Sequence, residues 1–310
     1  MTATGVLSRI EGGYLHSFRA MASPCELRVL CDDEALSARL GRMVENEALR
    51  IERKFSRYRD DSVIGRINKA GGAAVEVDEE TAGLLDYADR IYALSGGRFD
   101  ITSGVLRRLW RFDGSDRIPS AAEVRSLLPL IGWRKVVWRD RRLALRAGME
   151  IDFGGLGKEY AVDRCLLMVQ AAAPATPALV NFGGDLRVSG PRADGSRWRV
   201  AIESVDGGQT YEGWLEIASG ALTTSGDARR FLLKDGIRYS HILDPRTGWP
   251  VRDPPRSVTV AAATCLEAGL LSSLAMMHGR DAEAFLAREG VKAWWVRDDA
   301  ATGAVTKNAS

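Results

Sequence analysis

The segment Ile151–Glu159 has the residue types of an anion-binding site. A glycine-rich turn follows a strand-like stretch and leads into an expected helix with Lys158 in its first turn. Exposed N–H groups at a helix start bind anions such as phosphate, and Lys158 adds a full positive charge. A Walker loop would need glycine at Asp152 and Ser or Thr at Glu159, and the dinucleotide pattern GxGxxG fails at Tyr160. A plain strand-to-helix turn remains the alternative.

Two other segments combine small residues with an acid. In Asn181–Asp185, adjacent glycines permit a close approach of the backbone to a ligand, although they also make tight turns. Thr223–Asp227 offers small hydroxyls and a carboxylate in what we expect to be an exposed loop. Since the chain has no GxSxG elbow there, a serine hydrolase has little support.

His241 is the one of the three histidines that lies among polar turn residues, ahead of Asp244. It would suit a position beside a phosphate or a reacting hydroxyl, although a surface-strand histidine is the alternative. Phe99 and Asp100 follow a predicted helix end. We expect Phe99 in the core, while Asp100 could accept a hydrogen bond from a ligand.

Composition excludes several classes of function. The 310 residues carry 43 Lys and Arg against 41 Asp and Glu, a net charge of +2, so no global field attracts nucleic acid or an anionic membrane. A hydrophobic content of 45% is typical of a globular protein. Four cysteines without a CxxC pair and three histidines give little support for zinc or disulfide frameworks. Without an apolar run of signal-peptide length or of the ~18 residues of a membrane span, we expect a cytoplasmic protein with no integral membrane segment.

The elements that must position these residues follow from hydrophobic periodicity and turn signals. Helices are predicted over residues 33–56, 62–68, 78–94, 120–130, 158–172, 266–277 and 282–288. Strands are predicted over residues 14–20, 25–30, 135–138, 143–145, 150–153, 179–181, 198–202, 210–217, 238–243, 257–263 and 293–296. Strands that follow strands favour an α+β fold: antiparallel sheets with packed helices on one face. We expect one compact unit of two interlocked lobes over residues 10–300, with flexible termini at 1–9 and 301–310.

Taken in order, these segments resemble the ApbE family of flavin transferases, which move FMN from FAD onto a Ser or Thr hydroxyl of a target protein. The resemblance extends from Phe18 to about Gly279, and the ordered set carries it. The matching pieces are Phe18–Met21, Phe55–Tyr58 with Asp61, Ser62 and Asn68, Gly97–Asp100, Asp152–Lys158, Asn181–Asp185, Ser225–Asp227 and His241–Gly248.

This resemblance implies a single ApbE-like (T-fold-like) unit, FAD as substrate, Mg²⁺, release of AMP, and an acceptor protein with a target Ser or Thr as partner. The positions that match the lining of the FAD site are Met21, Tyr58, Arg98, Phe99, Asp100, Asp152 and Lys158, with His241 and Ile242 beside them. Lys158 would stabilise phosphate charge, and His241 or Asp227 would help to move the proton.

The family's magnesium ion is held by a backbone carbonyl, here that of Gly155, and by a helix motif resembling Ala-Asp-Ala-Leu-Ser-Thr. This chain has Ala-Gly-Leu-Leu-Ser-Ser, so Gly269 stands at the Asp position, while Ser272 and Ser273 keep hydroxyl oxygens. Glu267 would point about 200° away from Gly269 on the helix and is not expected to replace the acid.

Glu159 also departs from the family pattern, because it stands where a glycine usually follows the lysine and places a negative charge near the expected phosphate site. These departures keep two alternatives to an FMN transferase open. One is a noncatalytic FAD-binding relative with a degraded metal site, and the other is an interaction module that keeps only the scaffold.

Overall fold

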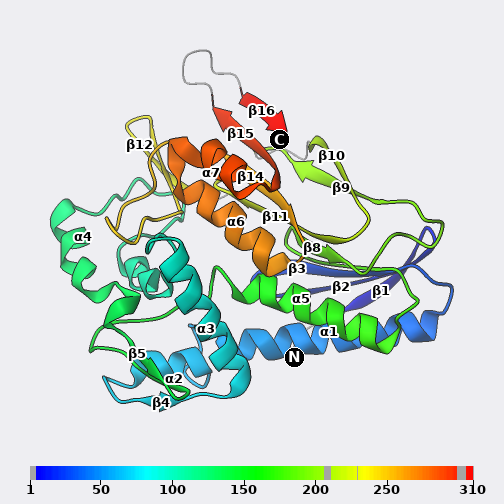
Figure 1. Ribbon diagram of the computed structural model, residues 1–310, viewed down its shortest axis with the longest axis horizontal. Coiled ribbons are helices and arrows are strands. Elements are labelled where there is room, and N and C mark those ends of the chain that lie inside the picture. Colours follow the sequence, from blue (N-terminus) through cyan, green and yellow to red (C-terminus); the bar gives the residue numbers. More distant parts are fainter. Residues whose placement is uncertain (1–4, 206–210, 229, 299–304, 310) are drawn as a thin grey trace.

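The computed structural model describes residues 5–205, 211–228, 230–298 and 305–309. Its centre is an antiparallel nine-stranded sheet (Figure 1). In spatial order the strands are β1 (Val6–Ile10), β2 (Gly13–Ala20), β3 (Ser23–Val29), β7 (Ala178–Phe182), β8 (Asp185–Val188), β11 (Gly220–Gly226), β14 (Ser257–Ala262), β15 (Lys292–Asp298) and β16 (Val305–Ala309).

The predicted hairpin at the start of the chain is confirmed as β2 and β3. Alternate residues of β3, Cys25, Leu27 and Val29, are buried, as a strand with one face on the core requires. Met21 and Ala22 make the turn in the left-handed region, with φ of 51° and 56°. The Met21 N–H donates to Glu52 Oε1 at 2.8 Å, which ties this turn to the neighbouring helix.

Three of the described helices cover one face of the sheet, namely α1 (Glu34–Phe55), α5 (Gly157–Ala172) and α6 (Cys265–Met277), and α7 (Ala282–Glu289) packs on α6. The others are α2 (Val63–Lys69), α3 (Glu79–Leu94) and α4 (Ala121–Leu127). Helix α1 contacts β2 and β3, α5 contacts β7 and β8, and α6 contacts β11 and β14. The three helices thus share one large apolar core with the strands beneath them.

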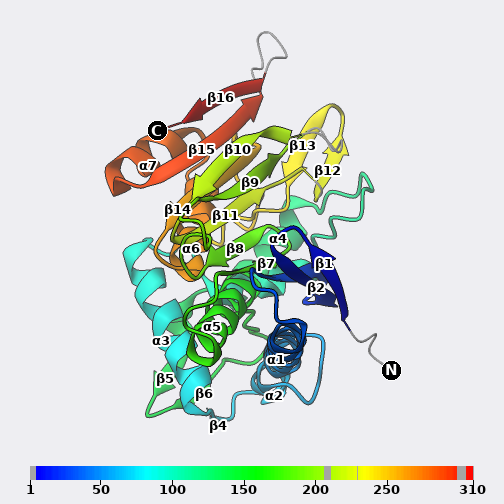
Figure 2. The ribbon, with the colours of Figure 1, turned by 90° about the vertical axis from the view of Figure 1, so that its right-hand side faces the viewer.

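The opposite face of the sheet has its own smaller core. The hairpin of β9 (Trp198–Glu203) and β10 (Tyr211–Ile217) covers it (Figure 2). Leu179 and Leu222 point to this side, whereas their neighbours Val180 and Ala221 belong to the large core. This alternation explains why these strands are apolar on both faces.

A second lobe is inserted between α1 and α5. It contains α2, α3, α4 and a small sheet of β4 (Val75–Glu76), β5 (Val137–Arg139) and β6 (Arg142–Ala144) (Figure 1). Its apolar residues join the large core, and a satellite cluster links Leu106 and Val124 to Leu232 of the hairpin β12 (Phe231–Lys234) and β13 (Ile237–Ser240).

The mixed fold of helices and antiparallel strands is as the sequence predicts, but two local predictions are wrong. Thr223–Asp227 is not an exposed loop, because Gly220–Gly226 forms β11 in the middle of the sheet and Thr223 is 1% exposed. Glu150–Phe153 forms no strand. The Asn68 side chain bonds both the N–H and the C=O of Ile151, so this backbone is satisfied without a strand partner.

Parts of both chain ends form edge strands of the central sheet. Val6–Ile10 pairs with β2, and Val305–Ala309 pairs with β15. The other residues of those two segments that were expected to be flexible, apart from Gly5, lie outside the described ranges. Among the described helices, none combines the length and the apolar character needed to cross a bilayer.

Candidate functional site

Lys158 is fixed where α5, β8 and the β2–β3 hairpin meet. Its Nζ lies 2.7 Å from Oδ2 of Asp185, the buried first residue of β8. Burial alone would lower the pKa of Lys158, but Asp185 outweighs it and the pKa is raised. Gly183 packs beside this pair: its φ is +62°, and an added Cβ would lie only 2.9 Å from Ser23 Oγ and at an ordinary contact distance of 3.7 Å from Lys158 Nζ. The site therefore holds a charged ammonium at the start of a helix.

Glu159, the next residue of α5, lies over Gly269 of α6. A Cβ added to Gly269 would be 2.6 Å from Glu159 Cγ and 3.1 Å from its Oε1. Glu159 Oε2 is buried and has no hydrogen-bond partner in the described part of the chain. Burial and the nearby Asp185 carboxylate raise the pKa of Glu159 to about 7. The side chain thus occupies the volume that the missing side chain of residue 269 leaves free.

Four hydroxyls from β11 and α6 form a cluster one turn farther along α6. Ser225 Oγ lies 2.8 Å from Ser272 Oγ and 3.2 Å from Ser273 Oγ, and Thr223 Oγ1 lies 3.5 Å from Ser272 Oγ. Ser272 also donates to the carbonyl oxygen of Gly269 at 3.1 Å. The hydroxyl cluster therefore lies next to Gly269, the residue of α6 that Glu159 covers.

Asp163 sets the position of α6 against α5. Its carboxylate accepts from the backbone N–H groups of Cys265 and Leu266 at 2.8 and 3.0 Å, and it pairs with Arg187 at 2.8 Å. It thereby satisfies N–H groups of the first helical turn that have no partner within α6. Since Glu159 and Asp163 are four residues apart on one face of α5, the same face that caps α6 also presents Glu159 to Gly269.

Asp152 lies in a second polar group at the edge of the inserted lobe. Its carboxylate accepts from an Arg57 guanidinium N–H and, at 2.9 Å, from the Gly154 N–H. Arg57 also lies over the Tyr58 ring and donates to the Tyr58 hydroxyl at 2.7 Å. Tyr58 is 78% exposed, so its ring is available to a planar ligand.

Phe99 and Asp100 support the site from within the core. The Asp100 carboxylate accepts from the N–H and hydroxyl of Thr102 and from the N–H of Trp133, at 2.6 to 3.1 Å. Phe99 is 6% exposed, and a Cβ on Gly155 would lie 3.3 Å from its ring. The prediction of Phe99 as a core residue is confirmed, and Asp100 caps the 3₁₀ helix Ile101–Arg108.

His241 and Asp227 differ in how available they are for proton transfer. His241 Nδ1 lies 3.0 Å from the Arg230 carbonyl oxygen, and burial with the Arg230 charge lowers the His241 pKa to about 4. Asp227 is 2% exposed and held between Arg238 and Arg256 at 2.9 and 3.0 Å. In this arrangement Asp227 ties strand ends together, whereas His241 keeps a neutral ring.

Arg98 faces the segment that follows His241. Burial and the charge of Arg246 lower the pKa of Arg98, against an opposing effect of Asp244, which itself pairs with Arg246 at 2.6 Å. Ile242 is partly buried against the large core, and its carbonyl accepts from Val251. Arg98, four residues past the end of α3, thus lies near the Asp244–Arg246 pair.

The structure places the predicted residues in several local environments rather than in one cluster. Lys158 pairs with Asp185, and Ser272 and Ser273 contact Ser225 of β11. Asp152 and Tyr58 share Arg57, and Arg98 lies near the Asp244–Arg246 pair. Sequence reasoning left out Arg57 and the pairing of Asp185 with Lys158, and it took Glu159 only as a charge near phosphate. No sequence spacing signals these contacts, since their partners lie on other elements.

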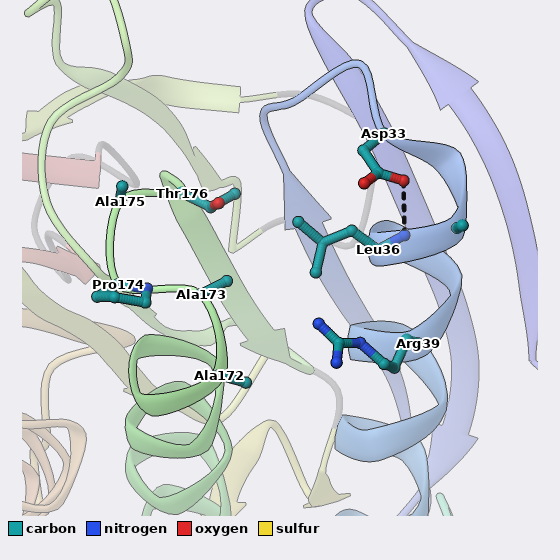
Figure 3. Close-up of a pocket in the computed structure, with 9 residues that line it drawn as sticks. Asp33, Leu36, Arg39, Ala172, Ala173, Pro174, Ala175 and Thr176 are labelled. Atoms are coloured by element: carbon teal, nitrogen blue, oxygen red, sulfur yellow. Dashed lines mark hydrogen bonds between the residues drawn. The ribbon is translucent and has the colours of Figure 1, made fainter.

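One hollow of the surface lies away from these groups, at the other end of α5 (Figure 3). It runs from Ala172–Thr176 to the first turns of α1, where the Asp33 carboxylate caps the helix by accepting from Leu36 N–H at 2.8 Å. Arg39 is the only other charged lining residue among those described. The hollow therefore has no converging group of reactive side chains.

A family model described as the ApbE family matches residues 21–295. The chain belongs to the ApbE family. Two ApbE crystal structures share its fold. The Thermotoga maritima protein has a TM-score of 0.85 and 31% sequence identity, and the match covers 96% of this chain and 97% of that one. The apo form of the Pseudomonas stutzeri flavinyl transferase has a TM-score of 0.84 and 27% sequence identity, and the match covers 100% of this chain and 96% of that one.

Relatives named FAD:protein FMN transferase cover most of the chain. The Vibrio cholerae protein is 30% identical over 259 residues, which is 81% of this chain and 76% of the relative. The Salmonella typhimurium protein is 30% identical over 307 residues, which is 95% of this chain and 85% of the relative. The expected family and its α+β fold are thereby confirmed.

Proposed function

We propose that this ApbE-family protein is an FAD:protein FMN transferase, which moves FMN from FAD to a Ser or Thr hydroxyl of an acceptor protein and releases AMP. The observation that carries the proposal is Lys158, held charged by Asp185 at the start of α5. A cation beside helix-start N–H groups suits a pyrophosphate. The names of the relatives support the same substrate.

The reaction balances without an oxidant. The acceptor hydroxyl oxygen forms a bond to the phosphorus on the FMN side, and the bond from that phosphorus to the bridging oxygen breaks as AMP leaves. His241, which is neutral above its lowered pKa, accepts the hydroxyl proton. Lys158 stabilises the charge that develops on the phosphate oxygens, because phosphoryl transfer depends on positioning and electrostatics.

The remaining predicted residues divide into groups that touch FAD and groups that support those contacts. We propose that Tyr58 offers its exposed ring to a planar ring of FAD, that Asp152 accepts from polar groups of the ligand, and that Arg98 faces its negative charge. Met21 and Ile242 supply apolar surface, and Phe99 and Asp100 hold these residues in place from the core.

The donor set of the α5–α6 interface fits Mg²⁺, which prefers oxygen ligands and keeps several water molecules. Three or more His, Cys, Asp or Glu side chains gather nowhere in the described ranges, so a site built of protein acids alone is absent there. The hydroxyls of Ser272 and Ser273 and the Gly155 carbonyl would hold the ion together with substrate phosphate. When bound, it would neutralise charge on the pyrophosphate.

The test incubates the purified protein with FAD, MgCl₂ and a flavin-acceptor domain, and then records in-gel fluorescence after denaturation. We expect a labelled acceptor, and at least tenfold less label with Lys158→Gln, because the charge at the pyrophosphate is lost. Lys69→Gln removes a surface lysine, whose ammonium pairs with Asp60, and should leave the label unchanged. An acceptor without label at any enzyme concentration would refute the transferase.

A second candidate is a noncatalytic FAD-binding protein, which the absence of a carboxylate at Gly269 favours. It predicts FAD binding, measured as a change in flavin fluorescence, without any labelled acceptor. If FAD does not bind either, only a scaffold function remains. The gel assay and the binding titration together separate these outcomes.

We also propose a cytoplasmic location. All four cysteines are free thiols, and three of them are buried. Proteins of oxidising compartments commonly pair their cysteines, whereas free thiols are typical of the cytoplasm. Fractionation of cells that express the full-length gene product would test this location.

A further inference from the structure

We infer that Glu159 of α5 supplies the carboxylate ligand of a divalent cation at the α5–α6 interface, in the volume that Gly269 leaves open. The inference concerns the same site as the proposed transferase and rests on it for the identity of the natural substrate. Cation binding itself can be measured without FAD transfer.

The first observation is a buried acid with an unused oxygen. Glu159 is 9% exposed, and its Oε2 finds no hydrogen-bond partner among the described residues. A carboxylate oxygen in the interior without a partner is costly, and a bound cation would offset this cost. The ammonium of the adjacent Lys158 does not do so, because it pairs with Asp185 at 2.7 Å.

The second observation is the fit between Glu159 and Gly269. An added Cβ at residue 269 would lie 2.6 Å from Glu159 Cγ, a distance too short for two carbon atoms. A side chain at residue 269 and Glu159 therefore exclude each other in this conformation. The Glu159 carboxylate of α5 therefore lies next to Gly269, and a side chain at residue 269 of α6 would displace it.

The third observation is the chemistry of the neighbouring oxygens. Ser272 and Ser273 follow Gly269 by three and four residues and so lie on the same face of α6. Their hydroxyls meet Ser225 of β11 at 2.8 and 3.2 Å. One carboxylate beside several neutral oxygens suits a hard cation such as Mg²⁺ or Mn²⁺.

The test titrates Mn²⁺ into FAD-free protein and follows the electron paramagnetic resonance signal of free Mn²⁺. We expect one bound ion, and Glu159→Gln should weaken its binding about tenfold or more, because the variant keeps the shape and removes the charge. The double variant Glu159→Gly with Gly269→Asp moves the carboxylate to α6 and should restore most of the binding. Circular dichroism melting checks that each variant is folded.

Glu267→Gln is the matched control, because Glu267 is an exposed acid of the same helix and should not affect Mn²⁺ binding. Equal Mn²⁺ affinity of the native protein and Glu159→Gln would overturn the inference. So would a native protein that binds no Mn²⁺ either alone or with FAD. FMN transfer is scored separately on the acceptor gel, so a failure of cation binding and a failure of transfer can be told apart.

Discussion

Two neighbouring residues of α5 show how environment gives opposite charges different tasks. Lys158 and Glu159 are adjacent in sequence; Lys158 is partly buried and Glu159 is buried. Lys158 has a partner, Asp185, and the pair holds an ammonium where an anionic substrate would bind. Among the described residues, Glu159 Oε2 has no hydrogen-bond partner, which is why we propose that Glu159 binds a cation whereas Asp185 serves to hold Lys158.

His241 carries the first prediction at the scale of single residues. Burial and the Arg230 charge lower its pKa to about 4, against the opposing charge of Asp227. In flavin-free protein its imidazole should titrate near pH 4, well below 6.5, in an NMR pH titration assigned with His241→Gln. Because the unfolded state takes up this proton more readily, the contribution of His241 to stability should fall as the pH drops from about 6.5 to 4.

Arg230→Gln tests the cause of this shift. Removing the cation should raise the pKa of His241, while burial keeps it below 6.5. A midpoint near 6.5 in the native protein would contradict the prediction and would favour a solvated histidine.

At the scale of elements, the sequence predicts those whose signals are local. Helix α1 begins after its cap Asp33, whose side chain accepts from Leu36, and it ends one residue before Ser56. The capping box of Ser120 and Glu123 likewise marks the start of α4. Such contacts lie within three residues of each other, so periodicity and capping rules locate them.

Strand β11 could not be predicted in this way. Its hydroxyl residues look like a polar loop, because their burial depends on partners that are distant in sequence. Ser225 meets Ser272 across 47 residues, and Thr224 meets Thr259. The same holds for the site: Lys158 follows from its helix start, whereas the contact between Glu159 and Gly269 follows only from the packing of α5 on α6.

Glu80 joins three helices and gives a prediction at this scale. Its carboxylate pairs with Arg50 and Lys54 of α1 at 2.6 and 2.5 Å and accepts from Tyr160 of α5 at 2.7 Å. Burial alone would raise the pKa of Glu80, but these three partners lower it to about 2. Glu80→Gln should therefore reduce the free energy of unfolding by about 1–3 kcal/mol at pH 7, as measured in urea.

The pH dependence follows from the lowered pKa. The stabilisation is complete above the unfolded pKa of about 4.5 and is lost as the pH falls toward 2, so the difference between native and variant should be smaller at pH 3.5. Glu79→Gln removes an exposed neighbouring acid and should change stability by less than about 0.5 kcal/mol. A constant difference for Glu80→Gln between pH 7 and 3.5 would show that charge is not its cause.

For the whole molecule, the shared core decides whether the two lobes unfold together. Leu85 of the inserted lobe and Val260 of the central sheet are both 0% exposed and belong to the same apolar cluster. Because the inserted lobe and the central sheet contribute to this one cluster, we expect them to unfold together. Urea unfolding should then be one transition, with the same midpoint by tryptophan fluorescence and by far-UV circular dichroism. Leu85→Ala should lower the free energy of unfolding by about 2–4 kcal/mol and leave a single transition. Val260→Ala should also lower the free energy of unfolding. If Leu85→Ala instead produced a separate transition at low urea concentration while the sheet stayed folded, the lobes would be independent domains. The polar groups at their boundary would then be positioned by the docking of two domains rather than by a shared core.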